Sequence, residues 1–346
     1  MKAVAFLKSL PIEHEESLLD VNMGAPTPGS RDLLVQVMAI SVNPVDTKIR
    51  SGGGPGAMGA GADELKVPGW DVAGLVVAVG GEVTLFKPGD EVYYAGAVDR
   101  AGCYSEFHLV DERLAGRKPL TLSFAEAAAL PLTTITAWEM MFDRLRIRKG
   151  REEETGDILI VGGAGGVGSI AIQLARRLTG MAVIATASRP ETQEWCRTLG
   201  AHHVIDHRQP LAPQVKAIAT GGVQYVLALT RTEDHFDDLV EAMASQSAMA
   251  LIETPAKPLD INKLKPKSIS LHWEFMFTRS RFQTPDMGEQ GRLLSELADI
   301  VDSGKIRSTL QTHMGSINAT NMKRAHALLE SGKSIGKIVL EGFGPV

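Results

Sequence analysis

The most chemically specific part of the sequence is a glycine-rich turn that follows the apolar run 158–161. Gly163, Gly165 and Gly168 form a G-x-G-x-x-G pattern, and apolar residues then recur at helical spacing. In such a strand–turn–helix, the first two glycines allow a tight turn and the close approach of a pyrophosphate, and the third allows close packing of helix on strand. The N-terminus of the helix offers unpaired N–H groups to phosphates. We therefore predict a dinucleotide site whose contacts are Gly163, Gly165, Gly166, Val167 and Gly168.

A second G-x-G-x-x-G pattern, at Gly54, Gly56 and Gly59, lacks both the preceding strand and the following helical periodicity. The motif requires this context, so we assign no phosphate site there. Residues 52–62 are mostly Gly and Ala and cannot supply a core. We expect them to form a mobile loop. In one interpretation, this loop borders the substrate pocket.

The residues after the second strand of the predicted nucleotide-binding domain decide between the two nicotinamide cofactors. NAD-binding proteins place an Asp or Glu there to bind the ribose 2′-hydroxyl, whereas this chain has Ser188 and Arg189. Because a guanidinium forms charge-assisted bonds with a phosphate, we predict NADPH. Alternatively, Ser188 only caps the following helix. His207 and Arg208 flank the adenine or the 2′-phosphate in one interpretation and belong to a solvated loop in the other.

Composition limits the classes of protein that fit. The chain has 346 residues, which suggests two domains, and 44% of them are hydrophobic and 22% charged, as in soluble globular proteins. Its formal net charge of −5 disfavours nucleic-acid binding. The cysteines, Cys103 and Cys196, are far apart, which excludes a disulfide framework and favours the reducing cytoplasm. Residues 1–6 resemble a short strand rather than a signal peptide, and no apolar run reaches membrane-spanning length, so we expect a cytoplasmic protein that binds no membrane.

The pattern of apolar runs divides the chain into two kinds of architecture. Up to about residue 120, short strands punctuated by Pro and Gly predict a partly open β-barrel. Residues 124–141 are helical, and strands then alternate with helices, which implies a doubly wound parallel sheet. The tail 305–346 returns to strand-like character. The predicted strands are 33–40, 72–79, 91–94, 158–161, 182–187, 203–206, 225–229, 248–252, 268–278 and 337–340, and the predicted helices include 190–199 and 293–303.

Several stretches, in order and at characteristic intervals, resemble the medium-chain dehydrogenase/reductase superfamily, in its quinone oxidoreductase or zinc-type alcohol dehydrogenase-like branch. They are Ser41–Gly52, Pro68–Gly74, Phe86–Val92, Ala127–Ala137, the glycine turn and Gly336–Leu340. The resemblance covers nearly the whole chain and implies an α/β fold. A GroES-like, partly open β-barrel catalytic domain at 1–124 would be completed by 305–346, and a doubly wound, parallel-sheet Rossmann domain at 125–304 would bind NADP. It also implies a homodimer paired through the edge strand 268–278, although an isolated edge strand would look the same.

The zinc-dependent members of this superfamily hold catalytic zinc with Cys, His and Cys, whose side chains are natural zinc ligands. By the resemblance, the corresponding positions here are Asn43, Trp70 and Leu132, and all three differ. The structural zinc of those relatives needs four clustered cysteines, and this chain has two dispersed ones. We therefore predict that the protein binds no metal.

An alcohol–ketone couple normally needs a Lewis acid to polarise the oxygen. We therefore predict a small-molecule acceptor whose conjugation spreads the developing charge, a quinone or an activated enone, with hydride supplied by NADPH. The competing hypotheses are a zinc-type alcohol dehydrogenase and a non-catalytic NADPH-binding protein.

Three closely spaced polar residues are candidates for the hydride site. The amide of Asn43 can orient the nicotinamide or bond a substrate oxygen, unless it only satisfies loop backbone groups. Asp46 is catalytic or structural, and Lys48, which stands where many quinone reductases have Tyr, could donate to a developing enolate. The resemblance also places Thr136 facing the nicotinamide, unless it only starts a helix, and Lys337 near the cofactor, unless it is a surface lysine.

Overall fold

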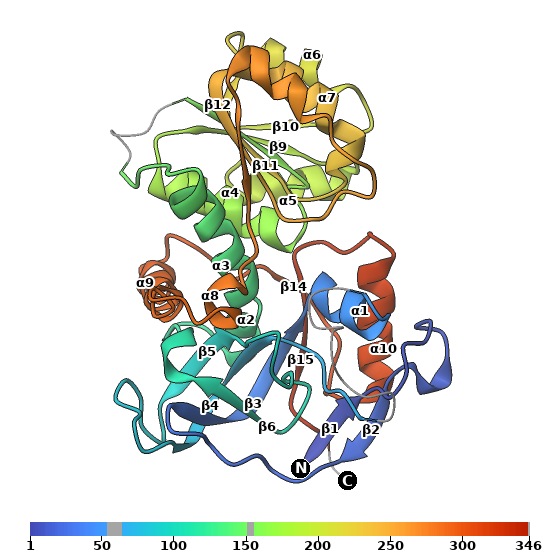
Figure 1. The fold of residues 1–346 in the computed structure, drawn as a ribbon, viewed down its shortest axis with the longest axis vertical. Coiled ribbons are helices and arrows are strands. Elements are labelled where there is room, and N and C mark those ends of the chain that lie inside the picture. The colour runs from blue at the N-terminus through green and yellow to red at the C-terminus, as the bar shows by residue number, and fades with distance from the viewer. Residues whose placement is uncertain (54–63, 151–155, 345–346) are drawn as a thin grey trace. The chain divides into compact units, whose positions relative to one another are not determined.

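The computed structural model describes residues 1–53, 64–150 and 156–344, and Figure 1 shows its fold. The chain divides into two compact units: unit 1 contains residues 1–132 and 277–346, and unit 2 contains residues 133–276. The glycine-rich loop expected at 52–62 falls largely outside the described residues. No helix in the described parts of the chain is long and apolar enough to cross a membrane.

Unit 1 is built on a seven-stranded, mainly antiparallel sheet in the order β14-β15-β3-β4-β5-β7, with β6 also paired to β3. Because β15 pairs antiparallel with β3, the C-terminal tail completes a sheet begun by the N-terminal part of the chain (Figure 1). A separate two-stranded sheet joins β1 and β2. The strands are β1 (Lys2–Ala5), β2 (Leu19–Asn22), β3 (Asp32–Val42), β4 (Asp71–Val79), β5 (Glu91–Ala95), β6 (Phe107–Asp111), β7 (Ala115–Arg117), β14 (Leu310–His313) and β15 (Lys337–Glu341).

The tail 305–346, for which we expected strand-like character, contains strands β14 and β15 and also a helix that was not expected, α10 (Ala319–Glu330). The Asn318 side chain caps this helix by accepting the Asn321 N–H at 2.9 Å, and its buried residues lie on one face. The other helices of this unit are α1 (Pro44–Arg50), α2 (Phe124–Ala128), α8 (Thr278–Arg281) and α9 (Glu289–Asp302), and α3 (Pro131–Trp138) begins at its border.

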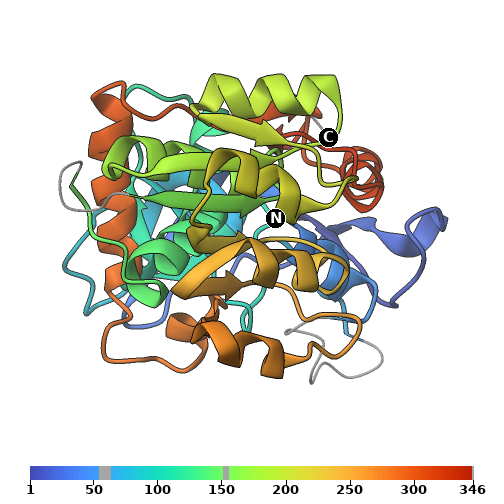
Figure 2. The same cartoon turned by 90° about the horizontal axis from the view of Figure 1, so that it is seen from above.

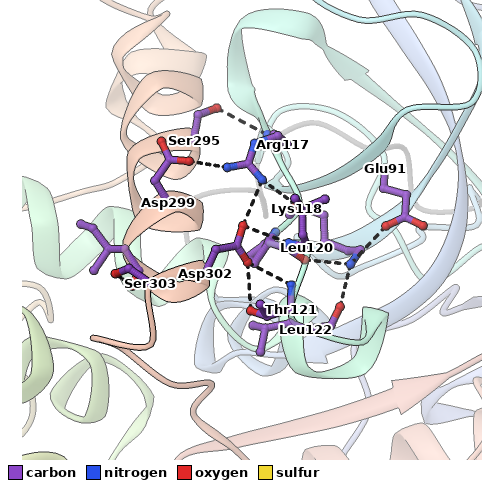
Figure 3. A network of polar contacts seen from close by, with 12 residues as sticks. Glu91, Arg117, Lys118, Leu120, Thr121, Leu122, Ser295, Asp299, Asp302 and Ser303 are labelled. Carbon is purple, nitrogen blue, oxygen red and sulfur yellow. Dashed lines mark hydrogen bonds and ion pairs between the residues drawn. The ribbon is translucent and has the colours of Figure 1, made fainter.

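Helix α9 is fixed within unit 1 by a polar network around Asp302 (Figure 3). The Asp302 carboxylate accepts the backbone N–H and the hydroxyl of Thr121, both at 2.9 Å, and pairs with Arg117 at 3.2 Å. Arg117 also lies 2.6 Å from Asp299. We expected the nucleotide-binding domain to end at residue 304, whereas unit 2 ends at residue 276. Helix α9 belongs to unit 1 because it packs on β7 and on the loop that follows β7.

Unit 2 is a six-stranded parallel sheet in the order β10-β9-β8-β11-β12-β13. Figure 2 shows helices on both sides of its strands, which confirms the predicted doubly wound arrangement. The edge strand expected at 268–278 is shorter, because the chain leaves the sheet after residue 273 and enters α8. The elements are β8 (Asp157–Val161), α4 (Gly166–Leu178), β9 (Ala182–Thr186), α5 (Pro190–Leu199), β10 (His203–Ile205), α6 (Leu211–Ile218), β11 (Val223–Ala228), α7 (Thr232–Ala242), β12 (Met243–Leu251) and β13 (Ser270–Trp273).

Candidate functional site

The glycine-rich turn connects β8 to α4 at the carboxyl edge of the parallel sheet. Gly162 has a φ of +85°, a conformation that favours glycine, and the Gly163 N–H donates to the Thr186 carbonyl at 3.0 Å. A Cβ on Gly168 would lie 2.3 Å from the Gly162 carbonyl oxygen, so helix and strand can approach this closely only with glycine there. The turn therefore has the tight form that the glycine spacing predicts.

Gly165 differs from its neighbours because no protein atom excludes a side chain at this position. A Cβ there would meet only the Gly162 carbonyl oxygen, at an ordinary 3.5 Å, and the φ of Gly165 is −73°. Gly165 is the N-cap of α4, and Gly166 and Val167 are its first residues. Their N–H groups lie at the positive end of the helix dipole. The turn thus fits the pyrophosphate of a dinucleotide, which would use the space left by the missing side chain.

Ser188 and Arg189 directly follow β9, which is the neighbour of β8 in the sheet. Arg189 rather than Ser188 is the N-cap of α5, and its N–H donates to the Thr192 hydroxyl at 3.1 Å. The alternative interpretation of Ser188 as the helix cap is therefore wrong. The Arg189 guanidinium lies 3.2 Å from Glu191, and both side chains are partly exposed.

His207 follows β10 and is connected to the glycine turn through one hydroxyl group. The Gly162 N–H donates to the Thr186 hydroxyl oxygen at 3.0 Å, and this oxygen lies 3.2 Å from Nδ1 of His207. Arg208, in contrast, is exposed and is bonded to the Asp206 carboxylate, with its shortest contact at 2.6 Å. The structure thus brings His207 to the turn, whereas Arg208 pairs with Asp206.

In unit 1, three predicted residues, Asn43, Asp46 and Lys337, lie in one buried polar cluster. The Asn43 amide nitrogen donates to the Ser41 carbonyl at 3.3 Å and to the Asp71 carboxylate at 2.8 Å, and its oxygen accepts from Lys337 at 2.5 Å. Both amide hydrogens are therefore committed within the protein. The Asn43 side chain can therefore offer a ligand only the remaining acceptor lone pair on its oxygen.

The centre of this cluster is an ion pair between Asp71 and Lys337 that the sequence analysis missed. The Lys337 Nζ lies 3.1 Å from Asp71, both side chains are buried, and Nζ also donates to the Val42 carbonyl at 3.0 Å. The second Asp71 oxygen accepts the Leu132 N–H at 2.7 Å. Burial raises the pKa of Asp71, and the Lys337 ammonium opposes this shift. Lys337 is 3% exposed, so its interpretation as a surface lysine is wrong. A cofactor contact would have to replace one of its internal bonds.

Asp46 lies on the other side of Asn43. Its Oδ2 accepts the Asn43 N–H and the Tyr104 hydroxyl, both at 2.8 Å, and the Tyr104 oxygen lies 3.2 Å from Nε2 of His326. Burial raises the pKa of Asp46 to about 7, and burial lowers the pKa of His326 to about 3. Oδ1 of Asp46 and Nδ1 of His326 have no hydrogen-bond partner among the residues that the structure describes. Sequence reasoning missed His326 because it is 222 positions from Tyr104 and no local pattern marks it.

Replacing Asp46 by asparagine is expected to flatten part of the pH dependence of stability. The Asp46 carboxyl has a pKa near 7 in the folded state and about 4 in the unfolded state. The folded protein therefore loses stability as the pH rises from 4 to 7 and this group ionises. Asparagine stays neutral and can still accept the two bonds. Relative to Asp46→Asn, wild type should lose on the order of 2–4 kcal/mol between pH 4 and pH 8 in urea denaturation. The exposed Asp99→Asn serves as the control, and parallel curves for wild type and Asp46→Asn would refute the buried carboxylic acid.

The two remaining candidates are Lys48 in unit 1 and Thr136 in unit 2. Lys48 is exposed on α1, so the structure does not bring it into the buried group of Asn43 and Asp46. Thr136 is buried in α3, beyond the first turn of that helix, so the interpretation of Thr136 as a helix-start residue is wrong.

Comparisons with known proteins agree with this two-part architecture. Residues 29–137 match the alcohol dehydrogenase GroES-like domain family, and residues 199–340 match the zinc-binding dehydrogenase family. A zinc-type alcohol dehydrogenase-like protein of Staphylococcus aureus (strain COL) is 39% identical over 341 residues, which cover 98% of this chain and 99% of that protein. The chain belongs to the medium-chain dehydrogenase/reductase superfamily. The α/β fold class predicted from the sequence is thereby confirmed, and the chain is an oxidoreductase by family.

Other members of the superfamily carry different activities in their names. A Rhizobium etli CFN 42 structure, assigned by name to the zinc-dependent alcohol dehydrogenases, has a TM-score of 0.94 and 54% identity and covers 100% of this chain and 99% of its own. The quinone oxidoreductase of Coxiella burnetii has a TM-score of 0.81 at 26% identity over 99% of both chains. The NADPH-dependent alkenal/one oxidoreductase of Arabidopsis thaliana is 30% identical over 93% of this chain and 75% of its own length.

Zinc appears in the names of the Staphylococcus aureus and Rhizobium etli relatives. By the resemblance, Asn43, Trp70 and Leu132 stand where the zinc-dependent members have their ligands. The indole nitrogen of Trp70 donates to the Ala97 carbonyl, Leu132 offers only a backbone N–H, and Asn43 is bonded to Asp71 and Lys337. Across the described residues, no three His, Cys, Asp or Glu side chains are grouped to hold a metal ion. The donor set therefore does not fit zinc.

Proposed function

We propose that this chain is a zinc-independent, NADPH-dependent reductase that transfers hydride to a quinone or to an activated enone or carbonyl. The observation that carries the proposal is the Asp71–Lys337 ion pair. Asp71 contacts the side chain of Asn43 and the N–H of Leu132, two residues that by the resemblance stand at zinc-ligand positions, and its charge is matched by Lys337. The Asp71 carboxylate thus carries no unmatched negative charge that would attract a divalent cation.

The carboxyl edge of unit 2 supports NADPH as the cofactor. The glycine turn would hold the pyrophosphate at the N-terminus of α4, and Ser188, Arg189 and His207 would contact the adenosine end. None of these three is acidic, so a 2′-phosphate meets no carboxylate from them. When bound, NADPH supplies the hydride.

The chemistry of the acceptor follows from the groups in unit 1. Zinc-dependent enzymes polarise a carbonyl with the metal, whereas the Asp71–Lys337 pair is neutral overall and its donors are committed internally. A conjugated quinone or enone spreads the developing negative charge over its own atoms and needs less polarisation. This preference agrees with the name of the Arabidopsis relative, an alkenal/one oxidoreductase.

Spectrophotometry at 340 nm tests this proposal. Purified protein is mixed with NADPH or NADH and with a conjugated alkenal, a quinone or the matching saturated aldehyde, and alcohols are offered with NADP⁺. We expect kcat/KM to be at least tenfold higher with NADPH than with NADH, and at least tenfold higher with the conjugated acceptors than with the saturated aldehyde. A tenfold difference corresponds to about 1.4 kcal/mol of transition-state stabilisation. Oxidation of simple alcohols without reduction of any quinone or enone would favour an alcohol dehydrogenase. Tight NADPH binding without turnover would favour a non-catalytic protein.

We also propose a homodimer formed through the edge of the parallel sheet in unit 2. β13 is the last strand in the order of that sheet, and Trp273, at its end, is 53% exposed. A strand at the edge of a sheet, with an exposed indole at its end, is a suitable surface for strand pairing between two copies.

A further inference from the structure

Two histidines from different elements lie next to each other in unit 2. His207 follows β10 and His235 lies near the N-terminus of α7, with their ring centroids 6.4 Å apart and their planes inclined by 55°. Both residues are half-buried.

The position of His207 is compatible with either charge state of its ring. The Thr186 hydroxyl oxygen already accepts the Gly162 N–H, so its hydrogen is free to donate to Nδ1 of a neutral His207. If His207 is protonated, Nδ1–H donates to the same oxygen instead. His207 can therefore gain a proton when only the hydroxyl hydrogen of Thr186 turns.

The groups around His207 oppose its protonation when no ligand is present. Burial lowers the pKa of His207, and His235, Arg208 and Arg231 lower it further, while Asp206 opposes them. The nearby carboxylates are paired with arginines: Asp206 with Arg208 at 2.6 Å, and Asp234 with Arg231 at 2.6 Å. The histidine pair consequently lacks a dedicated anion. A dianionic phosphate placed beside it would supply one and would favour its charged form.

We propose that His207 and His235 form a proton-linked sensor of the adenosine 2′-phosphate, which takes up a proton when NADPH binds and not when NADH binds. This inference rests on the proposed NADPH site. Because both cofactors share every group except the 2′-phosphate, NADH is an internal control. If the pair takes up a full proton, the affinity for NADPH falls tenfold for each pH unit between about pH 7 and pH 8, whereas the affinity for NADH stays constant.

Isothermal titration calorimetry of the intact protein measures this uptake directly. NADPH and NADH are titrated at pH 7.5 in buffers with different ionisation enthalpies, and the slope of the observed heat against those enthalpies gives the protons bound. We expect between about half and one proton for NADPH and close to none for NADH. His235→Gln leaves the His207–Thr186 contact intact and should reduce the uptake, and His207→Gln/His235→Gln should abolish it. The exposed His313→Gln is the matched control and should behave like wild type.

Equal uptake with both cofactors, or uptake that persists in the double variant, would overturn the sensor. Tight NADPH binding without proton uptake would overturn it as well, and it would leave the proposed reductase function intact. If neither cofactor binds, the proposed function itself fails, and the sensor fails with it.

Discussion

Replacing Lys337 by methionine is expected to lower the free energy of unfolding by about 3–5 kcal/mol, the usual cost of removing one partner of a buried ion pair. Methionine fits the length of the lysine stem but leaves the Asp71 carboxylate, which is 0% exposed, without its countercharge. It also leaves the Asn43 oxygen and the Val42 carbonyl without the Lys337 donor. Urea denaturation at pH 7 provides the measurement.

Two variants separate the charge effect from a general loss of packing. Lys333→Met removes an exposed lysine and should change stability by less than about 0.5 kcal/mol. The double variant Asp71→Asn/Lys337→Met replaces the buried carboxylate by a neutral amide and should recover part of the loss, so the double-mutant cycle should show a coupling of at least about 1 kcal/mol. A loss below about 1 kcal/mol in Lys337→Met alone would contradict the structure at this pair.

Replacing Gly165 by alanine is expected to weaken NADPH binding at least tenfold, about 1.4 kcal/mol, while the protein remains folded. The new Cβ would meet no protein atom closer than 3.5 Å, so it would enter only the space assigned to the pyrophosphate. Gly168→Ala should instead lower both affinity and stability, because its Cβ would lie 2.3 Å from a backbone oxygen. Fluorescence titration with NADPH and thermal denaturation distinguish the two effects.

The matched control for Gly165→Ala is Gly221→Ala, in the same unit, where a Cβ would meet nothing within 4 Å. This variant should bind NADPH like wild type. Wild-type affinity in Gly165→Ala would show that the pyrophosphate does not approach the turn closely, and the proposed cofactor site would have to be abandoned.

The parts of the fold that the sequence predicted are those encoded by local patterns. The bounds of α5 coincide with the predicted helix 190–199 because Pro190 and Gly200 mark its two ends. The glycine turn was predicted because its motif combines a strand, a tight turn and a helix within a few residues. Helix α10 was missed because the strand-like run at 337–340 dominated the interpretation of the tail.

The polar cluster of unit 1 could be predicted only in part, since its members come from distant parts of the chain. Asn43 and Asp46 were singled out from a local motif, but the partner of Asp71 is 266 positions away. Nothing in the neighbourhood of Lys337 indicates that its ammonium group is buried against a carboxylate. The pairing is a consequence of β15 joining β3 in the sheet, which is a property of the whole fold.

The most direct test of zinc-free hydride transfer in this chain is a turnover assay on metal-depleted protein. The protein is treated with a strong chelator, its zinc content is measured by inductively coupled plasma mass spectrometry, and NADPH oxidation by a conjugated enone is followed at 340 nm. We predict less than about 0.1 zinc per chain and a kcat within about twofold of the untreated protein, because the side chains of Asn43, Trp70 and Leu132 are neither thiolates nor imidazoles. Stoichiometric zinc, or activity that is lost on chelation and restored by added zinc, would contradict this mechanism.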